Sequence, residues 1–224
     1  MVRFQNRSDA GKRLAEALTD YRDQQQLIVL ALPRGGVPVA VEVAAALRAP
    51  LDLLLVRKLG VPNHEELAMG AISSNHSLVL NREIIAQLRI SEATVASTRA
   101  HEERELLRRD RVYRDDRAPP EIRERTVILI DDGIATGATM RVAISVLRAQ
   151  AAAKIVVATP VVPSDVARPL QQEVDEFVYL IKPEPFYGVG FWYEDYMQVS
   201  DEDVIAALNK SWGSPAQALL QLRK

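Results

Sequence analysis

The feature that most constrains the fold is the stretch VILIDDGIATGAT, residues 127–139. It begins with four apolar residues, of which Val127, Ile128 and Ile130 are β-branched, and such a run is typical of a strand buried on both faces of a parallel sheet. Asp131 and Asp132 follow directly, at the carboxyl end of the strand, where open α/β sheets bind their ligands. The stretch therefore predicts an α/β fold with a ligand site at one edge of the sheet.

The loop that follows the two aspartates predicts an anion site. It supplies small residues and two hydroxyl groups directly before an apolar-periodic segment, 140–147, that predicts a helix. A loop at a helix N-terminus presents unpaired backbone N–H groups to an anion such as a phosphate. The residues of this loop are Ala135, Thr136, Gly137, Ala138 and Thr139.

The two aspartates are hard to explain as part of a strand. Successive strand residues point to opposite faces, so at least one charge would be buried without a partner. At the end of a strand, both carboxylates can accept hydrogen bonds from a vicinal diol such as that of ribose, while the loop holds its 5'-phosphate. The alternative is a structural acidic pair beside a turn, which a bare Asp-Asp would favour.

A second motif, PRGG at residues 33–36, follows a predicted strand at 27–32. Gly35 and Gly36 allow a backbone to approach a ligand closely, and a predicted helix at 37–47 begins at the same place. Because Arg34 can bind oxyanions through two parallel hydrogen bonds, the motif predicts a diphosphate cradle. The alternative is a Gly-Gly turn with a solvated arginine.

The remaining patterns alternate strands with helices, which predicts a doubly wound parallel sheet of the α/β class. Ser8 is expected to cap the first helix, and the segment from 91 to about 115 is expected to form a long charged helix with a solvated face. Further predicted elements are a strand at 51–56, a hairpin of 69–72 with 77–80, and strands at 155–159 and 177–181.

Composition excludes several classes of protein. The chain has 224 residues, of which 48% are hydrophobic, so it can fill a sizeable core. The absence of cysteine excludes disulfides and cysteine chemistry. The net charge of −2 does not call for nucleic acid as the main partner. No signal-peptide pattern or apolar run of transmembrane length is present, so we expect a cytoplasmic protein without a membrane partner.

Residues 127–139 resemble the signature of the type I phosphoribosyltransferases, which bind the ribose 5-phosphate of phosphoribosyl pyrophosphate (PRPP). The stretch is neither a P-loop nor a dinucleotide fingerprint, because Gly-Lys-Ser/Thr and GxGxxG are absent. From about Phe4 to about Val204, the chain resembles uncharacterised bacterial phosphoribosyltransferase-like proteins with PRGGVPVA and RKLG segments. The resemblance implies that Arg34, Gly35 and Gly36 bind pyrophosphate, often beside a non-proline cis peptide.

The resemblance also implies the domain organisation. Residues 1–224 form a single domain, with a core at about 24–160 and a helical tail at 201–224. A small hood subdomain combines the N-terminal segment with about 161–200.

The segment RKLGVPNHEE, residues 57–66, is rich in residues that discourage regular structure. In the resembled family this region contacts pyrophosphate, here through Arg57 and Lys58, and then forms a flexible loop that closes over the reacting centre. If a general base is needed, Glu65 or Glu66 is the candidate. The expected catalytic set is therefore Asp131, Asp132, Arg34, Lys58, Glu65 and Glu66.

The implied reaction displaces pyrophosphate from the anomeric carbon of PRPP by a nitrogen nucleophile. Magnesium, Arg34, Lys58 and the backbone of the two glycines would stabilise the leaving group. The Mg²⁺ would be held mostly through PRPP and water, with Asp131, Asp132 and Glu194 as the nearest carboxylates.

Acceptor recognition is expected in residues 183–194, which hold five of the twelve aromatic residues. The pattern resembles the hood of the oxopurine enzymes, and the expected acceptor-binding residues are Tyr187, Val189, Phe191 and Trp192. The alternative is an aromatic core or a dimer surface. Oxopurine enzymes usually carry aspartate where this chain has Ala135, whereas adenine enzymes carry alanine, so the loop and the hood indicate different purines.

Three functional hypotheses follow. The first is a magnesium-dependent phosphoribosyltransferase of nucleotide salvage, which uses PRPP and a purine-like or other nitrogenous acceptor. The second is a PRPP- or nucleotide-sensing regulator without catalysis, and the third is a non-enzymatic dimer module. Arg34, Lys58 and the loop carboxylates favour the enzyme, which we expect to be a homodimer.

Overall fold

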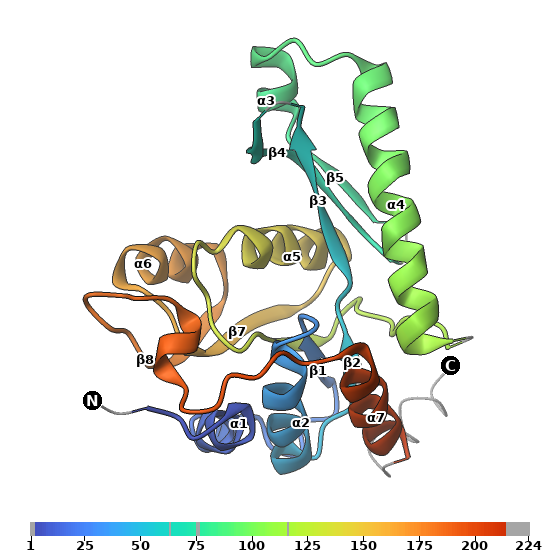
Figure 1. Cartoon of the computed structure of the whole chain (residues 1–224). Helices are drawn as coiled ribbons and strands as arrows, with labels where there is room; N and C mark the ends of the chain where they lie inside the picture. Colours follow the sequence, from blue (N-terminus) through green and yellow to red (C-terminus); the bar gives the residue numbers. More distant parts are fainter. Residues whose placement is uncertain (1–2, 63, 75–76, 116, 214–224) are drawn as a thin grey trace.

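The computed structural model describes residues 3–62, 64–74, 77–115 and 117–213 (Figure 1). Within the described part, no helix is both long enough and apolar enough to cross a membrane.

A parallel sheet of five strands forms the centre, in the order β2-β1-β6-β7-β8. All five residues of β1 are buried, as are the last four of β6, because each strand packs on both faces. Their bounds are β1 Leu27–Ala31, β2 Leu51–Leu53, β6 Thr126–Ile130, β7 Lys154–Val161 and β8 Glu176–Ile181.

Helices cover both faces of this sheet, which confirms the predicted doubly wound α/β class (Figure 1). One face carries α5 and α6, and the other carries α1 and α2. The short helix α7 lies beside α2 and docks through the Trp212 indole, which donates to the Leu51 carbonyl at 3.2 Å. The bounds are α1 Arg7–Glu16, α2 Gly36–Leu47, α5 Ala138–Ala149, α6 Ser164–Glu173 and α7 Asp201–Trp212.

The cap of α1 differs from the prediction. Asn6 is the N-cap, and its side chain accepts a hydrogen bond from the Asp9 amide. Ser8 lies inside the helix, where its hydroxyl donates to Glu42 at 2.6 Å. A bond to α2 thus replaces the expected capping role of Ser8.

Between β2 and β6 along the chain, an arm projects from the central sheet (Figure 1). It contains a three-stranded antiparallel sheet in the order β3-β4-β5, which lies between α5 and the long helix α4. The short helix α3 stands at the tip of the arm. The bounds are β3 Val56–Val61, β4 His64–Ser73, β5 Leu78–Leu80, α3 Arg82–Gln87 and α4 Glu92–Arg114.

The arm corrects two predictions and confirms two others. The strand expected at 51–56 is split, since β2 ends at Leu53 and Val56 already belongs to β3. The segment 57–66, expected to be a loop, lies largely in β3 and β4, whose pairing carries register shifts around Gly60. The hairpin of β4 with β5 and the long charged helix are confirmed.

The base of the arm is held by Arg114, at the end of α4. Its side chain is 1% exposed, and the guanidinium contacts four neighbours: Asp52 at 2.9 Å, the Leu53 carbonyl at 2.5 Å, the Ser74 hydroxyl at 3.3 Å, and Asp110. Because Asp52 lies in β2, this buried ion pair ties the arm to the edge of the central sheet.

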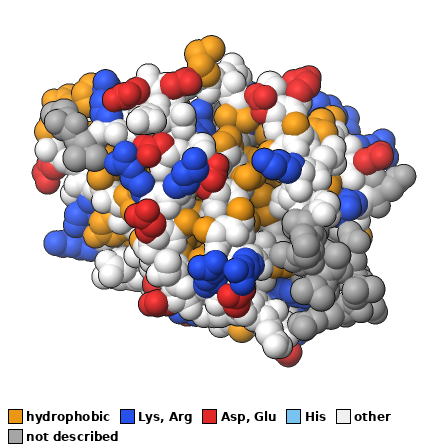
Figure 2. Space-filling view, turned by 90° about the horizontal axis from the view of Figure 1, so that it is seen from below, with side chains coloured by type: hydrophobic (Ala, Val, Ile, Leu, Met, Phe, Trp, Pro, Cys, Tyr) orange, Lys and Arg blue, Asp and Glu red, His pale blue; other side chains and the backbone are white. Residues whose placement is uncertain are grey.

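The segment after β8 crosses the first residues of the chain. Phe4 pairs with Tyr193 in an isolated parallel bridge, and its amide donates to the Trp192 carbonyl at 2.9 Å. The segment includes the short 3-10 helix η2, Val189–Trp192. The surface seen in Figure 2 carries interspersed positive and negative side chains, in keeping with the net charge of −2.

Candidate active site

The two aspartates follow the last residue of β6, as the sequence predicts. The amide of Leu32, just after β1, donates to the Ile130 carbonyl at 2.9 Å, so the ends of β1 and β6 lie side by side. Asp131 is half-buried and Asp132 is 6% exposed. The acidic pair and the PRGG motif therefore emerge at the same sheet edge.

The two motifs are in direct contact. A Cβ atom added at Gly35 would lie 2.2 Å from Oδ2 of Asp132, and one added at Gly36 would lie 2.6 Å from the Ile130 carbonyl oxygen. Only glycine leaves room for this approach. The peptide bond between Pro33 and Arg34 is cis, as the resemblance implied.

The third loop leads into α5. Gly137 is the N-cap with φ of +76°, a left-handed conformation that favours glycine, and it has no side chain to cap the helix. Ala135, Thr136 and Thr139 are exposed around it, and the Thr136 hydroxyl accepts a long hydrogen bond from the Ala138 amide at 3.4 Å. The N–H groups of the first turn and the two hydroxyls give this loop the chemistry of a phosphate cradle.

Asp132 has hydrogen-bond partners that sequence reasoning missed, at its carboxylate and at its backbone carbonyl. Nε of Arg7 donates to its Oδ2 at 2.7 Å, and the Tyr193 hydroxyl donates to its backbone carbonyl at 2.5 Å. Arg7 belongs to α1, and no local pattern in the sequence signals this contact across 125 positions.

Among the described residues, Asp131 lacks a comparable cationic contact of its own. Burial raises the pKa of its carboxyl well above the ordinary value, and the neighbouring charge of Asp132 raises this pKa further. The more distant charge of Arg7 acts in the opposite direction. The acidic pair is thus electrostatically costly, which is more typical of a ligand site than of a structural turn.

Arg34 is also engaged by a residue that sequence reasoning missed. Its guanidinium lies 3.6 Å from Asp201, in the first turn of α7. Tyr113 of α4 donates to the same carboxylate at 2.5 Å. Burial and the neighbouring Asp201 raise the pKa of Tyr113 to about 12, so its hydroxyl remains a donor at neutral pH. The chain from Tyr113 to Arg34 links the arm to the PRGG loop.

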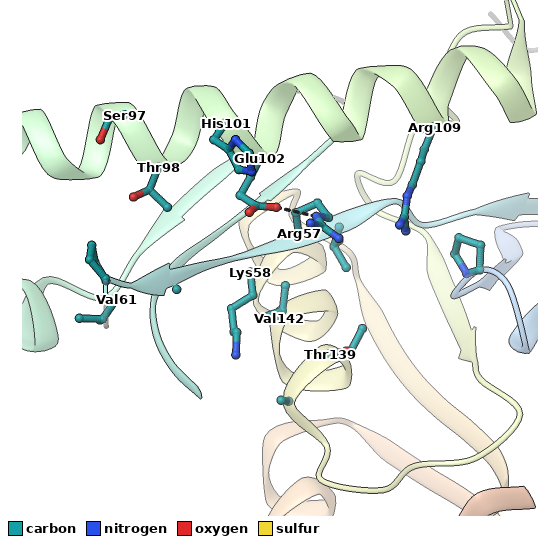
Figure 3. A pocket seen from close by; sticks show the side chains of 15 residues that line it. Arg57, Lys58, Val61, Ser97, Thr98, His101, Glu102, Arg109, Thr139 and Val142 are labelled. Carbon is teal, nitrogen blue, oxygen red and sulfur yellow. Dashed lines mark hydrogen bonds and ion pairs between the residues drawn. The ribbon is translucent and has the colours of Figure 1, made fainter. Parts of the chain in front are cut away.

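Arg57 and Lys58 lie on β3, and they point in different directions (Figure 3). The Arg57 guanidinium is bound to Glu102 of α4 at 2.6 Å, whereas Lys58 extends toward the start of α5. Successive strand residues face opposite sides, which accounts for the divergence. Lys58 is thus directed toward the loop that begins α5, whereas Arg57 is bound to α4 of the arm.

A cavity of about 750 Å³ lies between the arm and these loops (Figure 3). Pro33, Ala138 and Thr139 line it from the core, and β3 contributes Lys58. The polar face of α4 forms the far wall with Ser97, Thr98, His101, Glu102 and Arg109. The helix expected to be merely solvated therefore contributes one wall of this cavity.

The aromatic residues predicted to bind the acceptor lie beside the loop that follows Asp131 and Asp132. A Cβ atom added at Gly133 would lie 2.3 Å from the side chain of Val189, so η2 packs directly on that loop. Tyr187 is 63% exposed, and its ring centroid lies 5.0 Å from that of Phe191. Trp192 is 6% exposed and packs in a cluster with Phe4, so it is unsuited to the predicted role in acceptor binding.

Two further predictions concern carboxylates. The described residues contain no group of three or more His, Asp or Glu side chains arranged to hold a metal ion, so Glu194 does not join Asp131 and Asp132 in such a cluster. The side chains of Glu65 and Glu66 lie outside the described part of the structure, and their predicted role as a general base stays a prediction.

Comparisons with known proteins agree with this geometry. Over 218 residues the chain is 41% identical to a provisionally named phosphoribosyl transferase of Mycobacterium tuberculosis strain CDC 1551, and equally to that of strain H37Rv. The match covers 97% of this chain and 49% of each relative, so the chain spans about half the length of these curated relatives.

A solved structure also matches nearly end to end. The crystal structure of TT1426 from Thermus thermophilus is 39% identical, with a TM-score of 0.85 over 93% of this chain and 98% of the other. The sequence model described as the phosphoribosyl transferase domain matches residues 3–186. Since that match includes all three loops at the sheet edge, this chain belongs to the phosphoribosyl transferase domain family.

Proposed function

We propose that this protein transfers the 5-phosphoribosyl group of PRPP to a nitrogenous acceptor and releases pyrophosphate. The bond from the anomeric carbon to the diphosphate oxygen breaks, a bond to the acceptor nitrogen forms, and the acceptor loses a proton. The single observation that carries the proposal is the contact between Gly35 and the Asp132 carboxylate, which joins the diol-binding and diphosphate-binding motifs at one sheet edge.

The proposed donor site divides PRPP among three loops. The N-terminus of α5, with Thr136 and Thr139, binds the 5'-phosphate. The acidic pair accepts hydrogen bonds from the ribose hydroxyls. The backbone at Gly35 and Gly36, together with cationic side chains, stabilises the negative charge that grows on the leaving diphosphate.

Lys58 and Arg34 are the cations in best position for that role. Lys58 points toward the phosphate loop from the arm, and Arg34 belongs to the loop that contacts the acidic pair (Figure 3). The ion pair of Arg34 with Asp201 is loose at 3.6 Å and partly solvated, so a diphosphate can compete for the guanidinium.

Magnesium fits this site as a companion of the ligand. The half-buried Asp131 and its neighbour offer the hard oxygen atoms that Mg²⁺ prefers, but the described residues supply too few protein ligands for a complete shell. Mg²⁺ would therefore be held mostly by PRPP and water, where it would supply charge neutralisation of the diphosphate.

The hood is the proposed acceptor site. Tyr187 offers an exposed ring next to the segment that packs on Gly133, and a flat heterocycle can stack on it. Tyr187→Ala should raise the KM for the acceptor about threefold to tenfold, because such a stacking contact contributes about 0.5–1.5 kcal/mol. Tyr187→Phe keeps the ring and serves as the control, with an unchanged KM.

One assay tests the reaction itself. Purified protein is incubated with Mg²⁺, PRPP and a panel of purine and pyrimidine bases, and pyrophosphate release is measured. Release that depends on one base supports the transferase. Tight PRPP binding without release by any base would instead favour a PRPP- or nucleotide-sensing regulator, and absence of PRPP binding would refute both.

A further inference from the structure

Arg7 is a side chain outside the three loops that directly contacts the proposed ribose site. Its Nε donates to Oδ2 of Asp132 at 2.7 Å. The two side chains are 11% and 9% exposed, so the ion pair is largely removed from water. A charge pair in this environment is screened much less than a surface pair, and losing one partner leaves the other buried and uncompensated.

The rest of the guanidinium is held by the hood. One terminal nitrogen donates to the Met197 carbonyl at 2.8 Å. The guanidinium carbon lies 3.9 Å from the ring centroid of Tyr196 and 6.0 Å from that of Tyr193. A planar cation bound on its edge and stacked on its face has little freedom to rotate.

Asp132 is thereby fixed from two directions. Arg7 holds one carboxylate oxygen, Oδ2, and the Tyr193 hydroxyl holds the backbone carbonyl of the same residue. The Tyr196 side chain is hydrogen-bonded to the same carboxylate, so Arg7, Tyr193 and Tyr196 together fix the orientation of Asp132. A carboxylate has about four lone-pair sites, so it can still accept a hydrogen bond from a ligand. The cation also offsets the mutual repulsion of Asp131 and Asp132, which are adjacent in the chain.

We propose that Arg7 is a positioning residue for the ribose end of the donor site. It orients the Asp132 carboxylate toward the vicinal diol of a ribose 5-phosphate group and couples that carboxylate to the hood. This inference rests on the proposed function, because it assumes that the acidic pair binds ribose. It assigns Arg7 no contact with the diphosphate, which separates its effect from that of Arg34 and Lys58.

Two simple ligands can distinguish the effect of Arg7 from that of Arg34 and Lys58. Ribose 5-phosphate carries the diol and the phosphate, whereas inorganic pyrophosphate carries only the leaving group. We expect Arg7→Met to weaken the binding of ribose 5-phosphate about tenfold or more in calorimetry, on the scale of a lost charge-assisted hydrogen bond. The affinity for pyrophosphate should change less than about twofold. In the pyrophosphate-release assay, the KM for PRPP should rise more than kcat falls.

Two more variants exclude a merely structural effect. Arg7→Lys keeps the charge but loses the planar guanidinium with its several N–H donors. Its affinity for ribose 5-phosphate should therefore lie between those of the wild type and Arg7→Met. If Arg7→Met fails to fold, this lysine variant carries the test. Arg13→Met, on the same helix, removes a more exposed arginine paired with Asp9 and should bind both ligands as the wild type does.

The outcomes separate the two proposals. If the wild type binds ribose 5-phosphate and folded Arg7→Met binds it equally well, the role of Arg7 is refuted and the proposed function stands. Equal losses for both ligands, or Arg7→Lys indistinguishable from the wild type, would also overturn the positioning role. A wild type that binds neither ligand would refute the proposed function, and the role of Arg7 with it.

Discussion

The core and the arm contribute opposite walls of the cavity, and they are built differently. The core loops follow β1 and β6, in which nine of ten residues are buried. The arm is less uniformly buried, since only three of the 23 residues of α4 are buried and β5 has none, although residues 69–73 of β4 are buried. The core loops therefore take their positions from a sheet packed on both faces, whereas α4 and β5 of the arm have few buried residues.

The core and the arm therefore carry different kinds of groups. The acidic pair, which under the proposed function holds the ribose in fixed geometry, lies on the densely packed side. Lys58 and the polar face of α4 lie on the side with fewer buried contacts, where local opening costs less free energy. If this division between core and arm holds, binding of the donor depends mainly on the core, and the arm contributes less.

The largest effect is expected from the core. Replacing both carboxylates, in Asp131→Asn with Asp132→Asn, should weaken PRPP binding by at least about 100-fold, because about two charge-assisted hydrogen bonds of roughly 1.5–3 kcal/mol each are lost. Calorimetry measures the affinity, and a thermal melt shows that the variant is folded. Binding within threefold of the wild type would mean that the donor site lies elsewhere, for instance wholly in the arm cavity.

The second effect concerns the anchor of the arm. Arg114→Met leaves Asp52 buried without its partner and should lower the free energy of unfolding by about 3–5 kcal/mol. Chemical denaturation measures this loss. Arg108→Met is the matched control on the same helix, because Arg108 is 58% exposed and its loss should change the free energy of unfolding little. Similar losses in both variants would show that the arm is not held chiefly at its base.

The difference between the two walls also explains what the sequence reveals. β1 and β6 are short apolar runs because both of their faces are buried, so periodicity and the residues that follow them locate the sheet edge. The sequence placed Asp131 and Asp132, like Gly35 and Gly36, directly after such strands, and the family resemblance joined them in one donor site. The contact at Gly35 confirms the local reasoning.

The first strand of the arm, β3, escaped the same reasoning because it lacks an apolar run. β3 reads VRKLGV, with one glycine and two cations, and it is held by β4, α4 and α5 rather than by its own hydrophobicity. The partners of the site residues are distant in sequence for a similar reason. Arg7 meets Asp132 across 125 positions, and Tyr113 meets Asp201 across 88, so only the tertiary fold brings them together.

A smaller effect should come from the arm cation that faces the core, Lys58. Lys58→Ala should lower kcat/KM for PRPP about tenfold to 100-fold, as expected for the loss of one electrostatic contact to the leaving group, roughly 1.4–2.7 kcal/mol. Steady-state pyrophosphate release measures this loss. Lys210→Ala, an exposed lysine near the end of α7, is the charge-matched control and should be neutral. If kcat/KM were the same in Lys58→Ala as in the wild type, the arm would contribute no cation to the reaction.

The smallest effect should have the opposite sign, a gain in stability when one carboxylate of the acidic pair is removed. The fold raises the pKa of the Asp131 carboxyl. The folded protein therefore binds the proton of this carboxyl more tightly than the unfolded chain does. The associated stabilisation is complete below the unfolded pKa of about 3.9 and is lost as the pH rises through the raised pKa. At neutral pH the ionised side chain therefore destabilises the ligand-free protein.

Asp131→Asn should remove that penalty while it abolishes function. Its amide oxygen can still accept the hydrogen bond that the Asp132 amide donates to Asp131 at 2.9 Å, so local geometry is retained. Denaturation at several pH values should show the variant to be more stable than the wild type at pH 7 to 8, with an advantage that shrinks as the pH falls toward about 4. Glu184→Gln, at an exposed position, should show no such trend. A variant less stable than the wild type at neutral pH would mean that the acidic pair supports the fold of the core and is not kept there for a ligand.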